Sequence, residues 1–280
     1  MAEERSDAEL AREAITLSFD RSAASYEETG VAFFAPLGAE LVARAAPKPG
    51  EAVLDLGCGR GHCLFPAAEA VGPSGRVVGT DLSPNMVELC AADAAARGLG
   101  HVRVEVGDAG APAFPAGSFD LVTAGLVMFF VPEPRPAMRR VAELLRPGGR
   151  FAMTTFGPPD PKFGETMAIL YAHREGPPWP EPTDKPFEDA ESISGMLADA
   201  GFVDIRVEEV ARDTWFADVD QYWAWLGSHG GRILIDLLSP ERLAEAKAAV
   251  YAAIAGGCEP GGRLMTRSLV RYATAVVPAG

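Results

Sequence analysis

The sequence predicts an α/β protein in which a doubly wound, mostly parallel sheet of seven strands is covered by helices and carries helical lid insertions. Strand-like and helix-like segments alternate from Glu51 onward, a pattern typical of parallel strands joined by helical crossovers. Several short apolar runs stop at an acidic residue or at glycine, as buried parallel strands do. Two stretches, residues 156–188 and 212–262, exceed what such a sheet requires.

Length and charge limit what the protein does. At 280 residues, of which 48% are apolar, the chain can bury a large core in one domain with insertions or in two small domains. The net charge of −14 argues against a nucleic-acid partner, because binding to phosphates requires a basic surface. No apolar run of about 18 residues is present, so we expect no signal peptide, no membrane partner and a cytoplasmic location.

The cysteines form no CxxC pair and have no histidine at the spacing of a zinc site. We therefore expect free thiols in a reducing compartment and no bound metal.

The N-terminal segment, residues 1–49, is expected to form a helical cap ahead of the sheet. Residues 3–46 are rich in alanine, with interruptions at Gly30 and Pro36, and the turn from Pro47 to Gly50 closes them.

The first strand leads into a glycine-rich turn, VLDLGCGRG (Val53–Gly61), which begins with the acidic residue Asp55. Glycine occupies every second position of this turn, at Gly57, Gly59 and Gly61. Glycines adopt backbone angles that other residues avoid, and they leave room for a ligand against the main chain. A helix from Cys63 to Ala70 follows, and its first N–H groups face the turn. This order of elements outlines a nucleotide-cofactor site.

The spacing of the glycines separates this turn from two common phosphate-binding loops. A dinucleotide fingerprint would require glycine at position 62, which is His62. A P-loop would require Gly-Lys-Ser/Thr, which does not follow. An NAD-dependent oxidoreductase is therefore disfavoured.

Two further strands also end in acidic residues. Arg76–Thr80 leads to Asp81, and His101–Val106 leads to Asp108. The carboxyl ends of parallel strands meet at the edge where open α/β sheets bind ligands. There, Asp81 is suited to accept both ribose hydroxyls of an adenosine, and Asp108 to accept the adenine amino group. Ser83 is expected to cap the next helix.

The remaining elements continue the alternation. They are a fourth strand at Leu121–Ala124, a helix at Met138–Leu145, a fifth strand at Arg150–Thr155, a helix and a strand within Leu197–Val210, a helix at Pro240–Ala255 and a last strand at Arg263–Val277.

Five motifs, VLDLGCGRG, TDLSPNM, GDA, SFDLV and LRPGG, resemble those of class I S-adenosylmethionine-dependent methyltransferases. The resemblance implies a Rossmann-like core, residues 50–211 and 263–280, with an antiparallel last strand. It also implies S-adenosylmethionine as cofactor, S-adenosylhomocysteine as product, and an N-terminal helix folded over the cofactor. The cofactor-binding residues expected on this basis are Tyr26, Asp55, Gly57, Cys58, Gly59, Gly61, Asp81, Leu82, Met86, Gly107, Asp108, Ala109 and Ala124.

The insertion at residues 212–262 is predicted to cover the substrate. It contains His229, which is followed by two glycines and comes after an aromatic cluster, and we predict that this side chain is a general base. Arg232 is expected to hold an anionic group of the substrate. Phe129, Trp215 and Trp223 are expected to line an apolar substrate pocket. Ordinary packing is the competing interpretation for each of these residues.

The sequence therefore predicts in-line methyl transfer to a small-molecule acceptor, either a quinone-like compound or a specialised metabolite. Three alternatives stay open: a cofactor-retaining enzyme that rearranges or cyclises its substrate, a protein or RNA methyltransferase, and a non-catalytic binding protein. The acceptor atom (oxygen, nitrogen or carbon) and the presence of a homodimer are also open.

Overall fold

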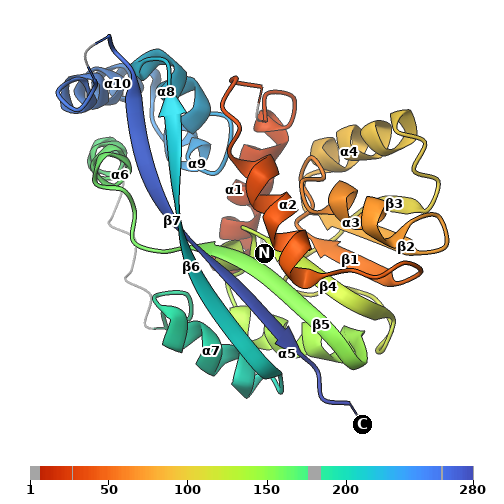
Figure 1. Ribbon diagram of the computed structural model, residues 1–280. Helices are drawn as coiled ribbons and strands as arrows, with labels where there is room; N and C mark the ends of the chain where they lie inside the picture. Colours follow the sequence, from red (N-terminus) through yellow and green to blue (C-terminus); the bar gives the residue numbers. More distant parts are fainter. Residues whose placement is uncertain (1–6, 27, 176–183, 260, 280) are drawn as a thin grey trace, which may run out of the picture.

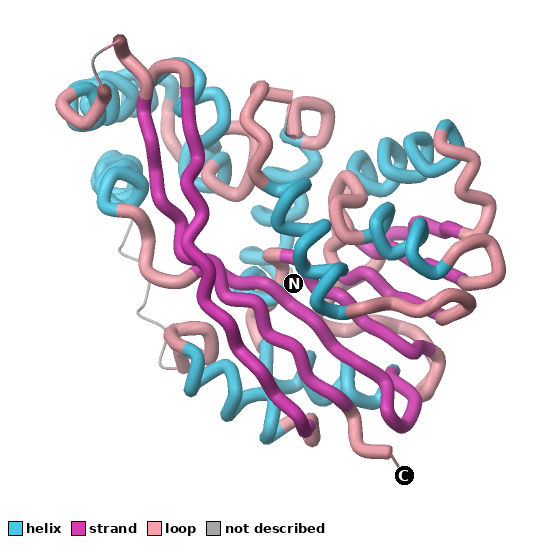
Figure 2. The backbone as a smooth tube through the Cα atoms, in the orientation of Figure 1, coloured by secondary structure: helices cyan, strands magenta, loops and turns pink. Residues whose placement is uncertain are grey.

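The computed structural model describes residues 7–26, 28–175, 184–259 and 261–279, and a seven-stranded sheet forms its centre (Figures 1 and 2). The strand order is β3-β2-β1-β4-β5-β7-β6. β7 is antiparallel to β5 and β6, and the other neighbouring pairs are parallel, which confirms the predicted fold class. The strands are β1 (Ala52–Leu56), β2 (Arg76–Asp81), β3 (Val102–Val106), β4 (Phe119–Gly125), β5 (Leu145–Phe156), β6 (Val203–Phe216) and β7 (Leu264–Val276).

Helices cover both faces of the sheet. α2, α3 and α4 pack on one face, whereas α5 and α7 pack on the other. Alternate strand residues supply two cores, with Val53 and Leu121 facing the first group of helices and Leu54 and Val122 facing the second. No helix in the described ranges is long and apolar enough to cross a membrane. The helices are α2 (Phe34–Ala45), α3 (Leu64–Val71), α4 (Pro84–Ala96), α5 (Pro134–Leu144) and α7 (Ala190–Asp199).

β6 and β7 extend beyond the other strands as a two-stranded overhang (Figure 1). β5 pairs with β7 only as far as Val270, so Leu264–Leu269 pairs with β6 alone. β6 continues to Phe216 because β7 provides it with a partner strand. The second insertion therefore begins after Phe216, whereas residue 212 was predicted.

The overhang carries the helices of the second insertion, α8 (Val219–Leu226), α9 (Arg232–Asp236) and α10 (Pro240–Ala255). Helix α6 (Pro161–His173), from the first insertion, packs on α10. The two insertions thus meet above the carboxyl edge of the sheet.

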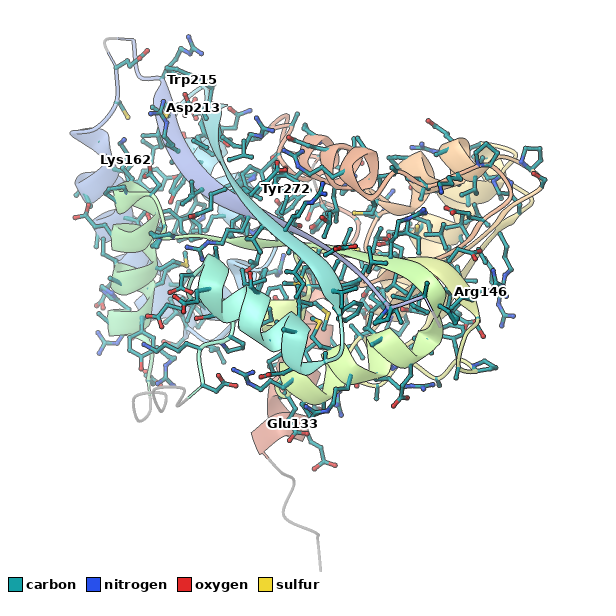
Figure 3. All side chains as sticks on the ribbon, turned by 60° about the horizontal axis from the view of Figure 1, so that its bottom comes forward. Glu133, Arg146, Lys162, Asp213, Trp215 and Tyr272 are labelled. Atoms are coloured by element: carbon teal, nitrogen blue, oxygen red, sulfur yellow. The ribbon has the colours of Figure 1, made fainter. Side chains whose placement is uncertain are left out.

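A charged cluster fixes α2 against β6 and β7. Glu40 of α2 accepts hydrogen bonds from Arg44 and Arg212, and from the Tyr272 hydroxyl at 3.2 Å. The Arg44 guanidinium also lies 4.2 Å from the centre of the Tyr272 ring. Figure 3 shows Tyr272 near the middle of the paired strands β6 and β7, and Trp215 nearer the end of their overhang.

The glycine turn is positioned by a close approach of α2. A side chain at Gly38 would place its Cβ 2.5 Å from the backbone oxygen of His62, the residue that follows the turn. Only glycine allows the helix to lie this close, because the opposing atom belongs to the main chain.

We expect Gly38→Ala to destabilise the protein by about 1–3 kcal/mol, because the added methyl group overpacks a contact with the backbone. Gly195→Ala is the matched control. Gly195 also lies within a helix, but nothing stands within 4 Å of an added Cβ. The control should gain about 0.5–1 kcal/mol from its helix propensity. Urea unfolding measures both changes, and equal stability of the two variants would contradict this account of α2.

Candidate active site

The three glycines of the turn have left-handed backbone angles, but they serve different purposes. Their φ values are +62° at Gly57, +49° at Gly59 and +87° at Gly61. A Cβ at Gly57 would meet Val127 at 2.4 Å, and one at Gly61 would meet Phe65 at 2.4 Å. At Gly59 nothing lies within 4 Å. Gly57 and Gly61 therefore allow packing, whereas Gly59 leaves open space on the cavity side of the turn.

A cavity of about 340 Å³ runs along the carboxyl edge, from the ends of β2 and β3 to the overhang of β7. It brings together residues that are far apart in the sequence. The predicted site residues that line it are Tyr26, Gly57, Gly59, Asp81, Leu82, Met86, Gly107, Asp108, Ala109, Phe129 and His229.

Other predicted cofactor residues lie behind the cavity wall. Asp55, Cys58 and Ala124 are buried within the core, and Gly61 packs on Phe65. Strand alternation turns the side chains of Asp55 and Ala124 into the layers beside the sheet. The Cys58 sulfur is packed against Gly79 of β2. Side-chain contact with a cofactor is therefore not available to Cys58 or Ala124.

The two predicted substrate-binding tryptophans lie outside the cavity. Trp215 is 41% exposed on the overhang, where the Arg263 guanidinium stacks 4.4 Å from its ring centre. Trp223 packs beside Tyr251 of α10. Trp225, two positions further along α8, lines the cavity instead, because successive residues of a helix point in different directions.

Arg232 does not line the cavity either. It forms an ion pair with Asp236, one helical turn further along α9, at 3.3 Å. This pairing explains why the side chain is turned away from a substrate, which corrects the predicted role of Arg232.

Asp55 is a buried carboxyl group beneath the turn. Its Oδ1 accepts a hydrogen bond from the Thr123 hydroxyl at 2.7 Å. No hydrogen-bond partner for Oδ2 is found in the described part of the chain. Burial raises the pKa of Asp55 to about 7; Asp81 adds to this shift, and Thr123 and the N–H of Leu64 oppose it. Asp55 does not line the cavity, so its side chain supports the glycine turn from beneath it.

Asp81 links the glycine turn to α4. Its Oδ2 accepts the N–H of Gly59 and its Oδ1 accepts the N–H of Ser83, both at 2.9 Å. Each oxygen keeps a further lone pair for a ligand hydroxyl. Burial raises the pKa of this carboxyl group. Ser83 caps α4 through the N–H of Met86, as predicted.

Helix α1 (Asp7–Ser22) lines one side of the cavity, and its contacts are not predicted from the sequence. Arg12 forms an ion pair with Asp108 at 2.9 Å, and Arg21 forms one with Asp236 of α9 at 3.3 Å. Asp20 accepts a hydrogen bond from the Ser83 hydroxyl at 2.6 Å. A helical spacing marks the cavity-lining stripe of α1, which consists of Arg12, Ile15, Thr16 and Phe19.

A strained residue stands at the end of β4. Leu126 lines the cavity with a φ of +52°, an unusual value for a side chain of this size. Its N–H donates to the Thr154 hydroxyl of β5 at 3.0 Å, which holds this conformation. The turn then continues into the short 3₁₀ helix η1 (Met128–Phe130).

Aromatic side chains form the part of the cavity beyond the glycine turn. The rings of Phe129 and Phe156 lie 5.8 Å apart, and those of Phe33 and Trp225 lie 5.3 Å apart. We call this part the aromatic chamber; its members are Phe33, Phe34, Phe129, Phe130, Phe156, Phe163 and Trp225.

His229 stands at the wall of the aromatic chamber. It is 8% exposed, with its ring centre 4.3 Å from that of Trp225 and 5.2 Å from that of Phe34. Its Nδ1 accepts the N–H of Gly231 at 3.3 Å, which places the proton of the neutral imidazole on Nε2.

Asp55→Asn should change how stability depends on pH. The folded chain holds the Asp55 proton up to about pH 7, whereas the unfolded chain releases it near its ordinary pKa of 3.8. The folded state therefore binds more protons between these values, and the free energy of unfolding falls as the pH rises. Asparagine removes this contribution, which reaches about 1.4 kcal/mol per pH unit. Urea unfolding between about pH 5 and pH 8 should show the variant gaining on the wild type, and parallel curves would contradict it.

Comparison with known proteins agrees with this geometry. A family model described as a methyltransferase domain matches residues 47–184. Nocamycin O-methyltransferase from Saccharothrix syringae is 37% identical over 290 residues, covering 94% of this chain and 98% of that protein. Aklanonic acid methyltransferase DauC from Streptomyces sp. (strain C5) is 48% identical over 141 residues, covering 50% of this chain and 64% of that protein.

A solved structure shares the fold across most of the chain. The [4+2]-cyclase SpnF superposes with a TM-score of 0.56 at 25% identity, covering 86% of this chain and 80% of that chain. The glycine turn, the acidic residues at the strand ends and the near full-length match to a methyltransferase lead to the same conclusion. The chain belongs to the family of S-adenosylmethionine-dependent methyltransferases.

Proposed function

We propose that this enzyme transfers a methyl group from S-adenosylmethionine to an oxygen atom of a large, mostly apolar small molecule, as in the biosynthesis of specialised metabolites. One observation carries the proposal: the glycine turn and the aromatic chamber belong to a single cavity. A cofactor bound at the turn would therefore direct its methyl group toward an acceptor held among aromatic rings. The relatives whose names specify O-methylation and an acid acceptor support oxygen as the acceptor atom.

The residues at the turn fit this cofactor. Gly59 leaves space where the cofactor would approach the backbone, and Asp81 offers lone pairs for two ribose hydroxyls. Asp108 would accept the adenine amino group, and Leu82 and Met86 would pack on the ring. Tyr26 would reach the carboxylate end.

The cofactor supplies a methyl group already activated by a cationic sulfur, so the chain has to align the acceptor and exclude water. Of the predicted cap at residues 1–49, α1 would cover the cofactor, whereas α2 packs on the sheet and residues 1–6 and 27 lie outside the described residues. The helices after Phe216 would serve as the lid over the acceptor. The aromatic chamber would provide the dry surroundings.

His229 would accept the proton of the acceptor hydroxyl. The basic nitrogen in the neutral side chain is Nδ1, so uptake of a proton there would replace the long hydrogen bond from Gly231. The contacts with Trp225 and Phe34 support a fixed ring orientation, which general base catalysis requires.

A cofactor-retaining cyclisation is the second candidate, supported by the similarity to a [4+2]-cyclase. Incubation with S-adenosylmethionine labelled in its methyl group separates the two, using a panel of hydroxylated polycyclic aromatic acids. Methyl transfer adds the label to the product and releases S-adenosylhomocysteine. An unlabelled product with the mass of its substrate would reject the proposed function in favour of cyclisation.

The cofactor site is tested by comparing Gly59→Val with Gly98→Val. Both glycines have positive φ, +49° and +69°, and neither has an atom within 4 Å of an added Cβ. The two variants should therefore lose similar stability, about 1–2 kcal/mol. Only Gly59→Val should lose affinity for S-adenosylhomocysteine, by at least about tenfold in calorimetry. Normal binding by Gly59→Val would show that the turn is not the cofactor site.

The role of His229 is tested by activity. His229→Ala should lower turnover by about a hundredfold or more while leaving cofactor affinity unchanged. His173→Ala is the control, because His173 lies on α6 and does not line the cavity. Recovery of most activity in His229→Asn, with an unchanged pH profile, would show that His229 only shapes the chamber.

A further inference from the structure

The cavity crosses several strands, and this sets the length of the acceptor. From the ends of β2 and β3 the lining continues past the glycine turn at the end of β1 and the ends of β4 and β5 to the overhang of β7, and the part from β1 onward is left for the acceptor. Three strand spacings separate β1 from β7, a span of about 14 Å. An acceptor that fills this span has roughly the length of a three-ring compound with a substituent at each end.

The far wall of the cavity carries two hydroxyl groups. Thr266 and Ser268 lie two residues apart on β7, so both face the cavity, whereas Arg267 between them faces outward and pairs with Asp213 at 2.6 Å. Thr266 is only 3% exposed. Neither hydroxyl has a hydrogen-bond partner among the residues that the structure describes. Hydroxyl groups that face an otherwise aromatic part of the cavity point to a polar ligand group at this wall.

Asp160 fixes the position of these hydroxyls. Its Oδ2 accepts the N–H of Arg267 at 2.8 Å, and its Oδ1 accepts the N–H of Lys162 at 2.9 Å. The carboxylate thus holds β7 between Thr266 and Ser268, in the part that β5 does not reach. Asp160 also lines the cavity, so its negative charge disfavours an anionic ligand group at this wall.

We propose that Thr266 and Ser268 recognise a neutral hydroxyl or carbonyl group at the end of the acceptor remote from the methylated atom. This inference rests on the proposed function and specifies its substrate class: an elongated, mainly apolar ring compound with a neutral polar group at its far end. The two side chains select the acceptor by binding its far end, and they do not contact the atoms that react.

The test measures the binding of 2-hydroxyanthraquinone and 2,6-dihydroxyanthraquinone in the presence of S-adenosylhomocysteine. The second compound carries a hydroxyl at both ends, so the wild type should bind it about tenfold more tightly than the first. In the double variant Thr266→Val, Ser268→Ala this ratio should fall to nearly one. Thr274→Val makes the same change on β7 at a position that does not line the cavity, and it should keep the wild-type ratio.

Binding of S-adenosylhomocysteine is measured first for each protein. If the wild type does not bind S-adenosylhomocysteine, this result counts against the proposed function itself and not against the roles of Thr266 and Ser268. With cofactor binding intact, a ratio near one in the wild type, no binding of either compound, or an unchanged ratio in the double variant would overturn the assignment of Thr266 and Ser268.

Discussion

The pairing of β6 with β7 beyond the end of β5 determines how this site is built. In the overhang β7 pairs with β6 and no longer with β5, which ends at Phe156. Glu40 of α2 accepts hydrogen bonds from Arg44, Arg212 and Tyr272. The bonds from Arg212 of β6 and Tyr272 of β7 fix these two strands against α2. Helices α8 to α10 connect β6 to β7, and α8 contributes Trp225 to the aromatic chamber.

The part of the site that the sequence predicts is the part that depends on local pattern. Asp81 and Asp108 follow apolar strands, and the topology of a parallel sheet brings such strand ends together regardless of their distance in sequence. Gly59 likewise lies in the turn that follows a buried strand, β1. The structure places all three on the cavity, and this placement required only the correct order of elements.

The rest of the site depends on the direction in which each side chain points, which is hard to predict from a sequence. Trp223 and Trp225 are both apolar neighbours on α8, yet only Trp225 faces the cavity, and the packing of α10 makes that choice. The sequence predicts Trp215 within a helical insertion, but the residue lies on β6, which continues this far because β7 pairs with it. The pairing of Arg232 with Asp236 follows a helical i, i+4 spacing that is visible in the sequence.

The contacts of α1 link the cofactor part of the cavity to the second insertion. Arg12 pairs with Asp108, which follows β3, and Arg21 pairs with Asp236 of α9. A movement of α1 that exposed one of these places would break its ion pair with the other as well, so both parts would open together.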